Sequence, residues 1–309
     1  MSKLLTVFGA TGHQGSSVIR TVLSDPALSR EFKIRGITRD VTKPDAKALA
    51  DQGVEVVSAD MTSIDSLIQA ITGSHTVFLV TTPTFTENST LELTQGRNVT
   101  DAAKQAGIQH LIFSSLLHVS ELTNGRLKNV PHFDHKAEIE RYIRASGIPA
   151  SFVLPGYFMS NYASLGMIRK GEDGAYTLAY PVGEDAGFPL VDIDEDLGKY
   201  VAIVLKSPSR TQGSQVLAAT DYYTSTRILK EFEEVTGHKT RFVQVDNETY
   251  KSFMPGYLGL EMLENHLFVE EPGYYNGRSL DESQALLAEA GYKATTWKEF
   301  LERNKGVFV

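Results

Sequence analysis

Three glycines spaced three residues apart stand where a short apolar run gives way to a helical pattern. Gly9, Gly12 and Gly15 follow residues 4–8 and precede apolar residues at helical spacing in residues 16–23. Such a turn can bind a pyrophosphate, because glycine permits a positive φ and lets backbone N–H groups approach the phosphates. The helix N-terminus adds unpaired N–H donors. An ordinary strand-to-helix turn is the alternative, since the spacing is G-x-x-G-x-x-G and not G-x-G-x-x-G, but the strand and helix around it favour dinucleotide binding.

The end of the second strand candidate, residues 32–38, carries a basic residue. Arg39 stands where an NAD-preferring domain of this type places Asp or Glu to bind the ribose 2′-hydroxyl. A guanidinium favours a 2′-phosphate instead, so the sequence predicts NADP(H) as the cofactor, with NAD weaker. Lys43 adds a positive charge four residues later. The alternative is a solvated arginine at a strand end, and Asp40 next to it would weaken the preference for NADP.

Strand and helix patterns alternate through the first half of the chain. Apolar runs of strand length at residues 54–59, 75–80 and 111–113 alternate with helical spacing at residues 64–71 and 91–106. This order is typical of an α/β Rossmann domain, a doubly wound parallel sheet that binds ligands at the carboxyl ends of its strands. We therefore expect cofactor contacts from the glycine turn and from residues that follow strands: Gly9, Thr11, Gly12, His13, Gln14, Gly15, Asp60, Met61, Thr81, Thr82, Pro83, Pro155, Gly156, Tyr157 and Phe158.

Four chemically active side chains stand close together in a segment with helical spacing. His132, Asp134 and His135 could ligate a metal ion, but on a helix the two histidines point about 60° apart. No further ligand is evident, so we expect no metal site. His132 and Lys136 are four residues apart and share one helix face. From the residues alone, this face is either a solvated amphipathic surface or part of a cofactor site.

The regular alternation ends near residue 161. We expect residues 1–161 to form the NAD(P)-binding Rossmann domain and residues 162–309 a smaller α+β lobe for a substrate or partner, with strands and helices that can return to the main domain. Residues 171–187 predict a loop or short hairpin, and Asp194 is a candidate N-cap for the helical pattern that follows it. Aromatic residues among glycines and prolines in residues 253–277 favour packing within the lobe over an exposed partner-binding patch.

The composition excludes several classes of protein. The chain has 309 residues and no cysteine, which excludes disulfides and thiolate catalysis and favours the cytoplasm or the nucleus. No apolar segment is long enough for a signal-peptide core or a membrane span. A formal net charge of −8 argues against direct contact with nucleic acid, which basic patches drive. We therefore expect a soluble protein without a nucleic-acid or membrane partner, while its oligomeric state stays open.

The whole chain resembles the NmrA-like family, an atypical branch of the short-chain dehydrogenase/reductase fold, and above all its redox-sensing NADP(H)-binding members. The resemblance rests on five motifs: Val7-Phe8-Gly9-Ala10-Thr11-Gly12-x-Gln14-Gly15, Thr38-Arg39, Gln52-Gly53-x-Glu55-Val56-Val57, His132-Phe133-Asp134-x-Lys136-x-Glu138-x-Glu140 and Leu154-Pro155-x-Tyr157-Phe158. Short-chain dehydrogenases pair a catalytic tyrosine with a lysine four residues later. At that spacing this chain has His132 and Lys136, so the resemblance implies that Lys136 binds the cofactor ribose and carries over no catalytic tyrosine.

Two functions follow from this resemblance. Several members of the family are sensors whose nucleotide state alters binding to a partner protein such as a transcription factor, and the missing tyrosine favours this hypothesis. The alternative is an NADPH-dependent reductase of quinones, carbonyls or related small molecules, with His132 and Lys136 as catalytic candidates. Histidine can exchange a proton near neutral pH, and related branches work without the tyrosine. Ser114 or Ser115 stands where the family fold places a substrate-polarising serine.

Overall fold

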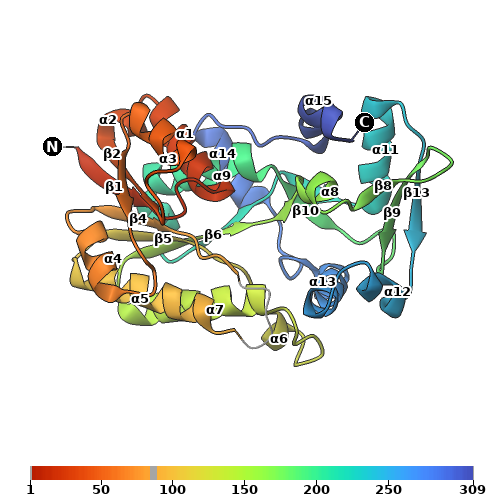
Figure 1. The fold of residues 1–309 in the computed structure, drawn as a ribbon, viewed down its shortest axis with the longest axis horizontal. Coiled ribbons are helices and arrows are strands. Elements are labelled where there is room, and N and C mark those ends of the chain that lie inside the picture. Colours follow the sequence, from red (N-terminus) through yellow and green to blue (C-terminus); the bar gives the residue numbers. More distant parts are fainter. Residues whose placement is uncertain (1, 84–88, 309) are drawn as a thin grey trace.

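A seven-stranded parallel sheet forms the centre of the larger part of the molecule (Figure 1). The computed structural model describes residues 2–83 and 89–308. The strands of the sheet are β1 (Lys3–Val7), β2 (Phe32–Thr38), β3 (Glu55–Ser58), β4 (Thr76–Leu79), β5 (His110–Ser114), β6 (Ala150–Pro155) and β11 (Gln215–Ala218). They lie in the order β11-β6-β5-β4-β1-β2-β3, and all neighbours are parallel. The expected Rossmann-type α/β fold is confirmed.

Helices cover both faces of this sheet, which is why its inner strands are nearly continuous apolar runs. The upper layer in Figure 1 holds α1 (His13–Ser24), α2 (Leu28–Glu31), α3 (Pro44–Asp51), α9 (Ile193–Lys206) and α14 (Asp281–Glu289). The lower layer holds α4 (Ile64–Ile71), α5 (Leu91–Gln105) and α7 (Pro131–Ser146). Two short helices, α6 (Val119–Leu122) and α10 (Pro208–Thr211), lie in connections.

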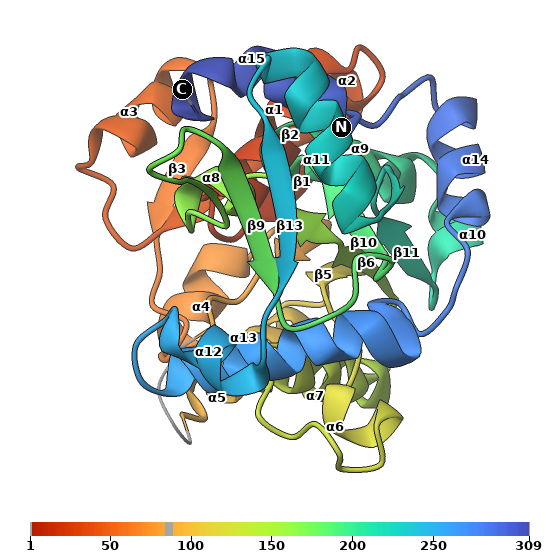
Figure 2. The same cartoon turned by 90° about the vertical axis from the view of Figure 1, so that its right-hand side faces the viewer.

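A smaller lobe lies beyond the carboxyl ends of the parallel strands. One of its sheets has the order β12-β10-β7 and the other β13-β9-β8. Figure 2 faces the second sheet, with one long helix crossing beneath it. The lobe contains β7 (Tyr157–Phe158), α8 (Asn161–Ser164), β8 (Ile168–Lys170), β9 (Tyr176–Tyr180), β10 (Phe188–Val191), β12 (Asp221–Tyr223), α11 (Ser225–Thr236), β13 (Thr240–Gln244), α12 (Asn247–Ser252), α13 (Tyr257–Phe268), η1 (Val269–Gly273) and α15 (Trp297–Phe308).

The second half of the chain contributes to both parts of the molecule. Strand β11 extends the main sheet, and α9 packs so closely on α1 that a Cβ atom on Gly198 would lie 2.2 Å from the carbonyl oxygen of Ser17. In the lobe, β8 and β9 form an antiparallel hairpin, of which β9 lies in the segment expected to be a loop or hairpin and β8 lies just before it. The aromatic segment 253–277 packs inward, because Phe268, Tyr274 and Tyr275 are buried. A division of the chain at residue 161 stays a prediction.

The expected N-cap of α9 is wrong by two residues. The side chain of Asp192 accepts the cap hydrogen bond from the backbone N–H of Glu195 at 3.3 Å. Asp194 lies in the first turn of the helix instead, where its carboxylate bonds to His13 Nδ1 at 2.7 Å. Both aspartates precede the same helical pattern, so spacing could not separate the cap from an acidic residue that favours the positive end of the helix dipole.

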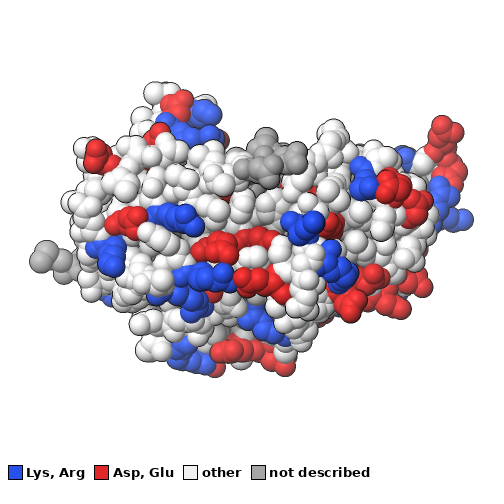
Figure 3. All heavy atoms as spheres, turned by 90° about the horizontal axis from the view of Figure 1, so that it is seen from below, with Lys and Arg blue, Asp and Glu red and all other residues white. Residues whose placement is uncertain are grey.

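The outer surface is mixed in charge on the side shown in Figure 3. There, the described acidic and basic side chains are interspersed. In proteins that bind nucleic acid, basic side chains cluster on one face or along one stripe. The described basic side chains on the face in Figure 3 form no such cluster. Among the described residues, no helix combines the length and apolar character needed to cross a membrane.

Candidate functional site

The glycine turn after β1 brings α1 close to the end of the strand. Gly9 has a φ of +63°, and its carbonyl oxygen accepts from the N–H of Gly12 at 2.9 Å. A Cβ atom on Gly15 would lie 2.2 Å from the carbonyl oxygen of Gly9, so this helix position admits only glycine without a shift. The turn therefore ends at the N-terminus of α1, whose first N–H groups have no partner within the helix.

A cavity of about 280 Å³ opens over this turn, at the carboxyl ends of β1 to β4. The strand order reverses between β1 and β4, which is where doubly wound sheets bind nucleotides. Seven expected cofactor residues line the cavity: Gly9, Thr11, Gly12, Arg39, Asp60, Met61 and Thr82. The other lining residues, which the sequence patterns do not assign to the cofactor, are Phe8, Ile37, Thr38, Ala59, Val80 and Gln95.

A basic side chain lies at the rim of this cavity. Arg39 is exposed, and its side chain forms no ion pair with the residues that the structure describes. The carboxylate of Asp40 accepts from the hydroxyl of Thr42 at 2.6 Å and from its N–H at 2.9 Å. These hydrogen bonds lower the pKa of Asp40, so it is charged but engaged with Thr42. The guanidinium of Arg39 is therefore available to an anionic ligand.

Three of the expected cofactor residues line neither this cavity nor the second cavity that adjoins it. His13 bonds to Asp194, and Gly15 is packed against the glycine turn. Lys43 is exposed and precedes the first residue of α3. Their contacts with a cofactor stay predictions.

A second cavity of about 330 Å³ adjoins the first at the end of β4, where Thr81 lines one and Thr82 the other. It lies between the carboxyl ends of the main sheet and α13 of the lobe. Nine expected site residues line it: Gln14, Thr81, Pro83, His132, Lys136, Pro155, Gly156, Tyr157 and Phe158. Seven further residues line this cavity and are not predicted by the sequence patterns: Leu116, Phe133, Asn161, Leu165, Met262, Asn265 and Tyr274. Most of this second set is apolar.

Lys136 is held at the wall of the second cavity by a buried carboxylate. Its ammonium group donates to Glu92 of α5, which also accepts from the hydroxyl of Thr81 at 2.7 Å. His135 Nδ1 lies 3.7 Å from the other oxygen of Glu92. Burial alone would raise the pKa of Glu92, but the interactions with His135, Lys136 and Thr81 lower it to about 2. Lys136 therefore enters the site as one half of an ion pair.

His132 is held by a second buried carboxylate. Its Nδ1 bonds to Oε1 of Glu261, a residue of α13 with 0% exposure. The two residues lie 129 positions apart in the sequence, so the contact joins the Rossmann part to the lobe. A carboxylate at Nδ1 fixes the orientation of the ring, as it does in catalytic histidine pairs. This arrangement can supply a proton to a bound molecule.

The two serines at the end of β5 do not take part in this arrangement. Ser114 and Ser115 are both fully buried, and neither lines the second cavity. The Ser115 hydroxyl donates to the carbonyl oxygen of Leu116 at 3.4 Å. A role in polarising a substrate is therefore not supported by their position.

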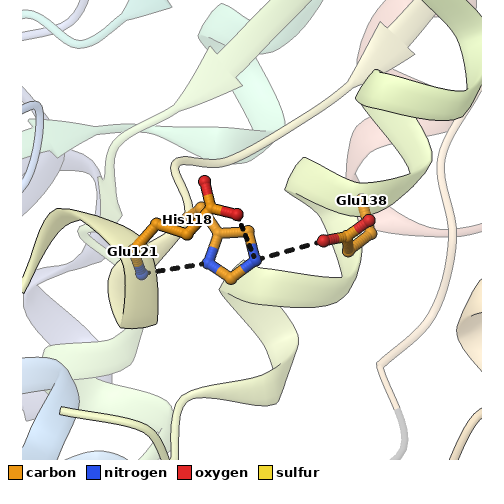
Figure 4. Close-up of side chains that lie close together, drawn as sticks. All are labelled: His118, Glu121 and Glu138. Carbon is orange, nitrogen blue, oxygen red and sulfur yellow. Dashed lines mark hydrogen bonds and ion pairs between the residues drawn. The ribbon is translucent and has the colours of Figure 1, made fainter. Parts of the chain in front are cut away.

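The candidate metal ligands of the histidine segment point to separate partners. His132 bonds to Glu261, His135 lies near Glu92, and Asp134 accepts from the N–H of Ser120 at 3.2 Å. A different group, His118, Glu121 and Glu138, places its ligand atoms within 4.8 Å of one another (Figure 4). Arg141 pairs with both glutamates, at 2.9 Å and 3.0 Å. The guanidinium of Arg141 therefore already balances the negative charges that a metal ion would otherwise neutralise.

Comparisons with known proteins agree with this fold. A model described as the NmrA-like family matches residues 1–301. The NmrA-like family domain-containing oxidoreductase ptmS of Penicillium ochrochloron is 33% identical over 304 residues, which cover 91% of this chain and 88% of that protein.

Two solved structures share the fold over nearly the whole chain. Triphenylmethane reductase of Citrobacter sp., complexed with NADP(H), has a TM-score of 0.78 at 25% identity and covers 98% of this chain and 99% of its own. NmrA, a negative transcriptional regulator, in complex with NADP, has a TM-score of 0.80 at 22% identity and covers 97% of this chain and 94% of its own.

Proposed function

This chain belongs to the NmrA-like family, and on that premise we propose that it is an NADP(H)-dependent reductase of a small, largely apolar molecule. The observation that carries the proposal is the second cavity. It adjoins the first cavity over the glycine turn, which we call the nucleotide cavity, and it is lined by His132, which bonds to the buried carboxylate of Glu261. A sensor needs only the nucleotide cavity, whereas a reductase needs space beside the nicotinamide and a source of a proton. The oxidoreductase names of relatives such as ptmS support the same conclusion.

The cofactor fits the two cavities end to end. The pyrophosphate would lie on the turn from Gly12 to Gly15, the 2′-phosphate near Arg39 and the adenine near Asp60. The nicotinamide would lie near Lys136 and residues 155–158 at the second cavity. The NADP(H) bound in the Citrobacter reductase supports this assignment, and the preference for NADP over NAD rests on Arg39 alone. When bound, the cofactor supplies a hydride.

His132 would supply the proton that completes the reduction. For a carbonyl, hydride adds to the carbon and the proton adds to the oxygen, which gives an alcohol and oxidised cofactor. The carboxylate of Glu261 would hold the ring in place during the transfer, and solvent would restore the proton afterwards. Lys136 would bind the ribose while Glu92 balances its charge.

The proposal is tested by NADPH consumption with a panel of quinones, aldehydes and imines. We expect turnover of about one per second or faster with at least one class, near the lower end of ordinary enzyme rates. His132→Ala and Lys136→Ala proteins are run beside the wild type. Nucleotide binding without NADPH consumption for any class would contradict a reductase.

A redox sensor is the second candidate, and one contact favours it. Lys136 is already paired with Glu92, and the tyrosine that normally acts with this lysine is absent. A sensor must differ between its NADP⁺-bound and NADPH-bound forms, because a partner protein has to distinguish them. Hydrogen exchange measured in both forms tests this. Identical protection throughout the lobe would count against a sensor.

A further inference from the structure

Asn265 places an unpartnered amide at the wall of the second cavity. The residue is 3% exposed, and its Nδ2 forms no hydrogen bond with the described part of the chain. A buried amide without a partner is costly, so such groups normally bond to protein, water or a ligand. Because Asn265 lines the cavity, a molecule in the cavity is the natural acceptor.

The position of Asn265 on α13 relates it to the proton donor. Glu261 and Asn265 are four residues apart and therefore share one face of the helix. Glu261 bonds to His132, and the Cβ atoms of Glu261 and Asn265 are about one helical turn, roughly 5–6 Å, apart. An acceptor bonded to Asn265 would bring the neighbouring part of the same molecule beside His132.

The rest of the cavity wall is suited to an aromatic molecule. Four aromatic residues line it: Phe133, Tyr157, Phe158 and Tyr274. The rings of Phe133 and Tyr274 pack edge to face at 5.3 Å, and the Tyr274 hydroxyl donates to the carbonyl oxygen of Pro155 at 3.1 Å. That hydroxyl is therefore already satisfied within the protein. Asn265 differs from it in having a donor still to satisfy.

We propose that Asn265 is the residue that recognises the substrate, by donating a hydrogen bond to a carbonyl oxygen on an aromatic molecule. The inference deepens the proposed reductase function, because it names the chemical class that the second cavity accepts. It requires only that the molecule binds, and binding can be measured without turnover.

The test uses a matched pair of probes, 2-acetylnaphthalene and 2-ethylnaphthalene, which differ by a carbonyl oxygen in place of two hydrogens. Their affinities are measured calorimetrically in the presence of NADP⁺, so that no reduction occurs. We expect the wild type to bind the ketone roughly tenfold more tightly than the hydrocarbon, the effect of one good hydrogen bond to an otherwise unpaired group. In Asn265→Leu this preference should fall to about one, because leucine keeps the size and removes the donor.

Two further measurements distinguish the loss of this hydrogen bond from misfolding of the variant. Asn265→Asp keeps the shape and replaces the donor with acceptors, so it should bind the ketone less tightly than the hydrocarbon. The melting temperature of each variant, compared with that of the wild type, shows whether the variant is folded. A ketone preference that survives in Asn265→Leu, or no binding of either probe to the wild type, would overturn the proposal.

These outcomes separate recognition from catalysis. Asn265-dependent binding of the ketone without NADPH consumption would leave the recognition role standing and contradict the reductase. NADPH consumption with an unchanged ketone preference in Asn265→Leu would support the reductase and contradict the recognition role of Asn265.

Discussion

Lys136 and Glu92 form an ion pair in which the lysine side chain is 6% exposed and the glutamate side chain is 0% exposed. Taking two charges out of water costs free energy, and their attraction offsets that cost only while both partners are present. Thr81 supplies a further hydrogen bond to the same carboxylate. The lysine that the family motif assigns to the cofactor is therefore also part of a buried charge cluster.

Glu92→Gln should lower the free energy of unfolding by about 3–5 kcal/mol near pH 7, because it leaves the ammonium of Lys136 buried without a counter-charge. Adding Lys136→Met should restore part of the loss, since the unpaired charge is then removed. Urea unfolding measures both. Glu55→Gln is the control, because Glu55 pairs with Arg35 at the surface and should cost about 1 kcal/mol or less. Equal losses for the two glutamates would contradict a buried pair.

The carboxylate of Glu92 should make the free energy of unfolding depend on pH in the acid range. The pKa of Glu92 is about 2 in the folded protein and about 4.3 in an unfolded chain. Its stabilisation is therefore complete above about pH 4.3 and is lost as the pH falls towards 2. The difference in unfolding free energy between wild type and Glu92→Gln should shrink over this range by about 3 kcal/mol. A difference that stays constant from pH 6 to about pH 2 would show that Glu92 is not held charged.

The sequence predicted the parts of the site that local patterns define. The turn from Gly9 to Gly15 follows from glycine spacing between a strand and a helix, and Thr81 follows from its place after an apolar strand. His132 and Lys136 follow from their helical spacing and from the family motif. Each of these signals lies within a few residues of the chain, where backbone periodicity and turn chemistry act.

The site residues that could not be predicted from the sequence are buried by contacts between segments far apart in the chain. Glu92, Glu261 and Asn265 sit in ordinary helical patterns, where a polar residue is usually solvated. Their burial depends on α5 packing against α7 and on α13 lying across the carboxyl ends of the sheet. No single-sequence pattern gives that packing. An acidic residue among apolar neighbours in the aromatic segment 253–277 was the one available signal for Glu261.

Arg39→Ala should weaken NADP⁺ binding by about 1.5–3 kcal/mol and leave NAD⁺ binding nearly unchanged, because only NADP⁺ carries the 2′-phosphate. Calorimetric titration of both nucleotides measures the difference. Arg30→Ala serves as the control, since Arg30 is exposed on α2 and does not line the nucleotide cavity. An equal loss for both nucleotides in Arg39→Ala would contradict the assignment.

Gly15→Ala and Gly12→Ala should fail in different ways. A Cβ atom at Gly15 meets the carbonyl oxygen of Gly9 at 2.2 Å, so this change should destabilise the fold by about 3 kcal/mol. At Gly12 the nearest such atom is 3.4 Å away, and the methyl group would lie at the wall of the nucleotide cavity. Gly12→Ala should therefore keep its thermal stability and bind NADPH less tightly. Similar melting temperatures for the two variants would contradict this account of the turn.

His132→Ala should reduce the turnover number by about 10²–10⁴, the usual contribution of a general acid. NADPH affinity should stay within about 1 kcal/mol of the wild type, because the nucleotide needs no proton in order to bind. Glu261→Gln should give a smaller loss, since glutamine can still hold the ring, although its amide oxygen forms a weaker hydrogen bond than a carboxylate does. Single-turnover kinetics with NADPH and the best substrate of the panel measures all three proteins.

Glu264→Gln is the matched control for this series. Glu264 lies on the same helix and accepts from the backbone N–H groups of Lys128 and Asn129, but it does not line the second cavity. A folded Glu264→Gln protein should therefore keep its turnover number, even if its melting temperature falls. If His132→Ala and Glu261→Gln turn over substrate as fast as the control, the histidine only shapes the cavity, and the proton must come from another group or from solvent.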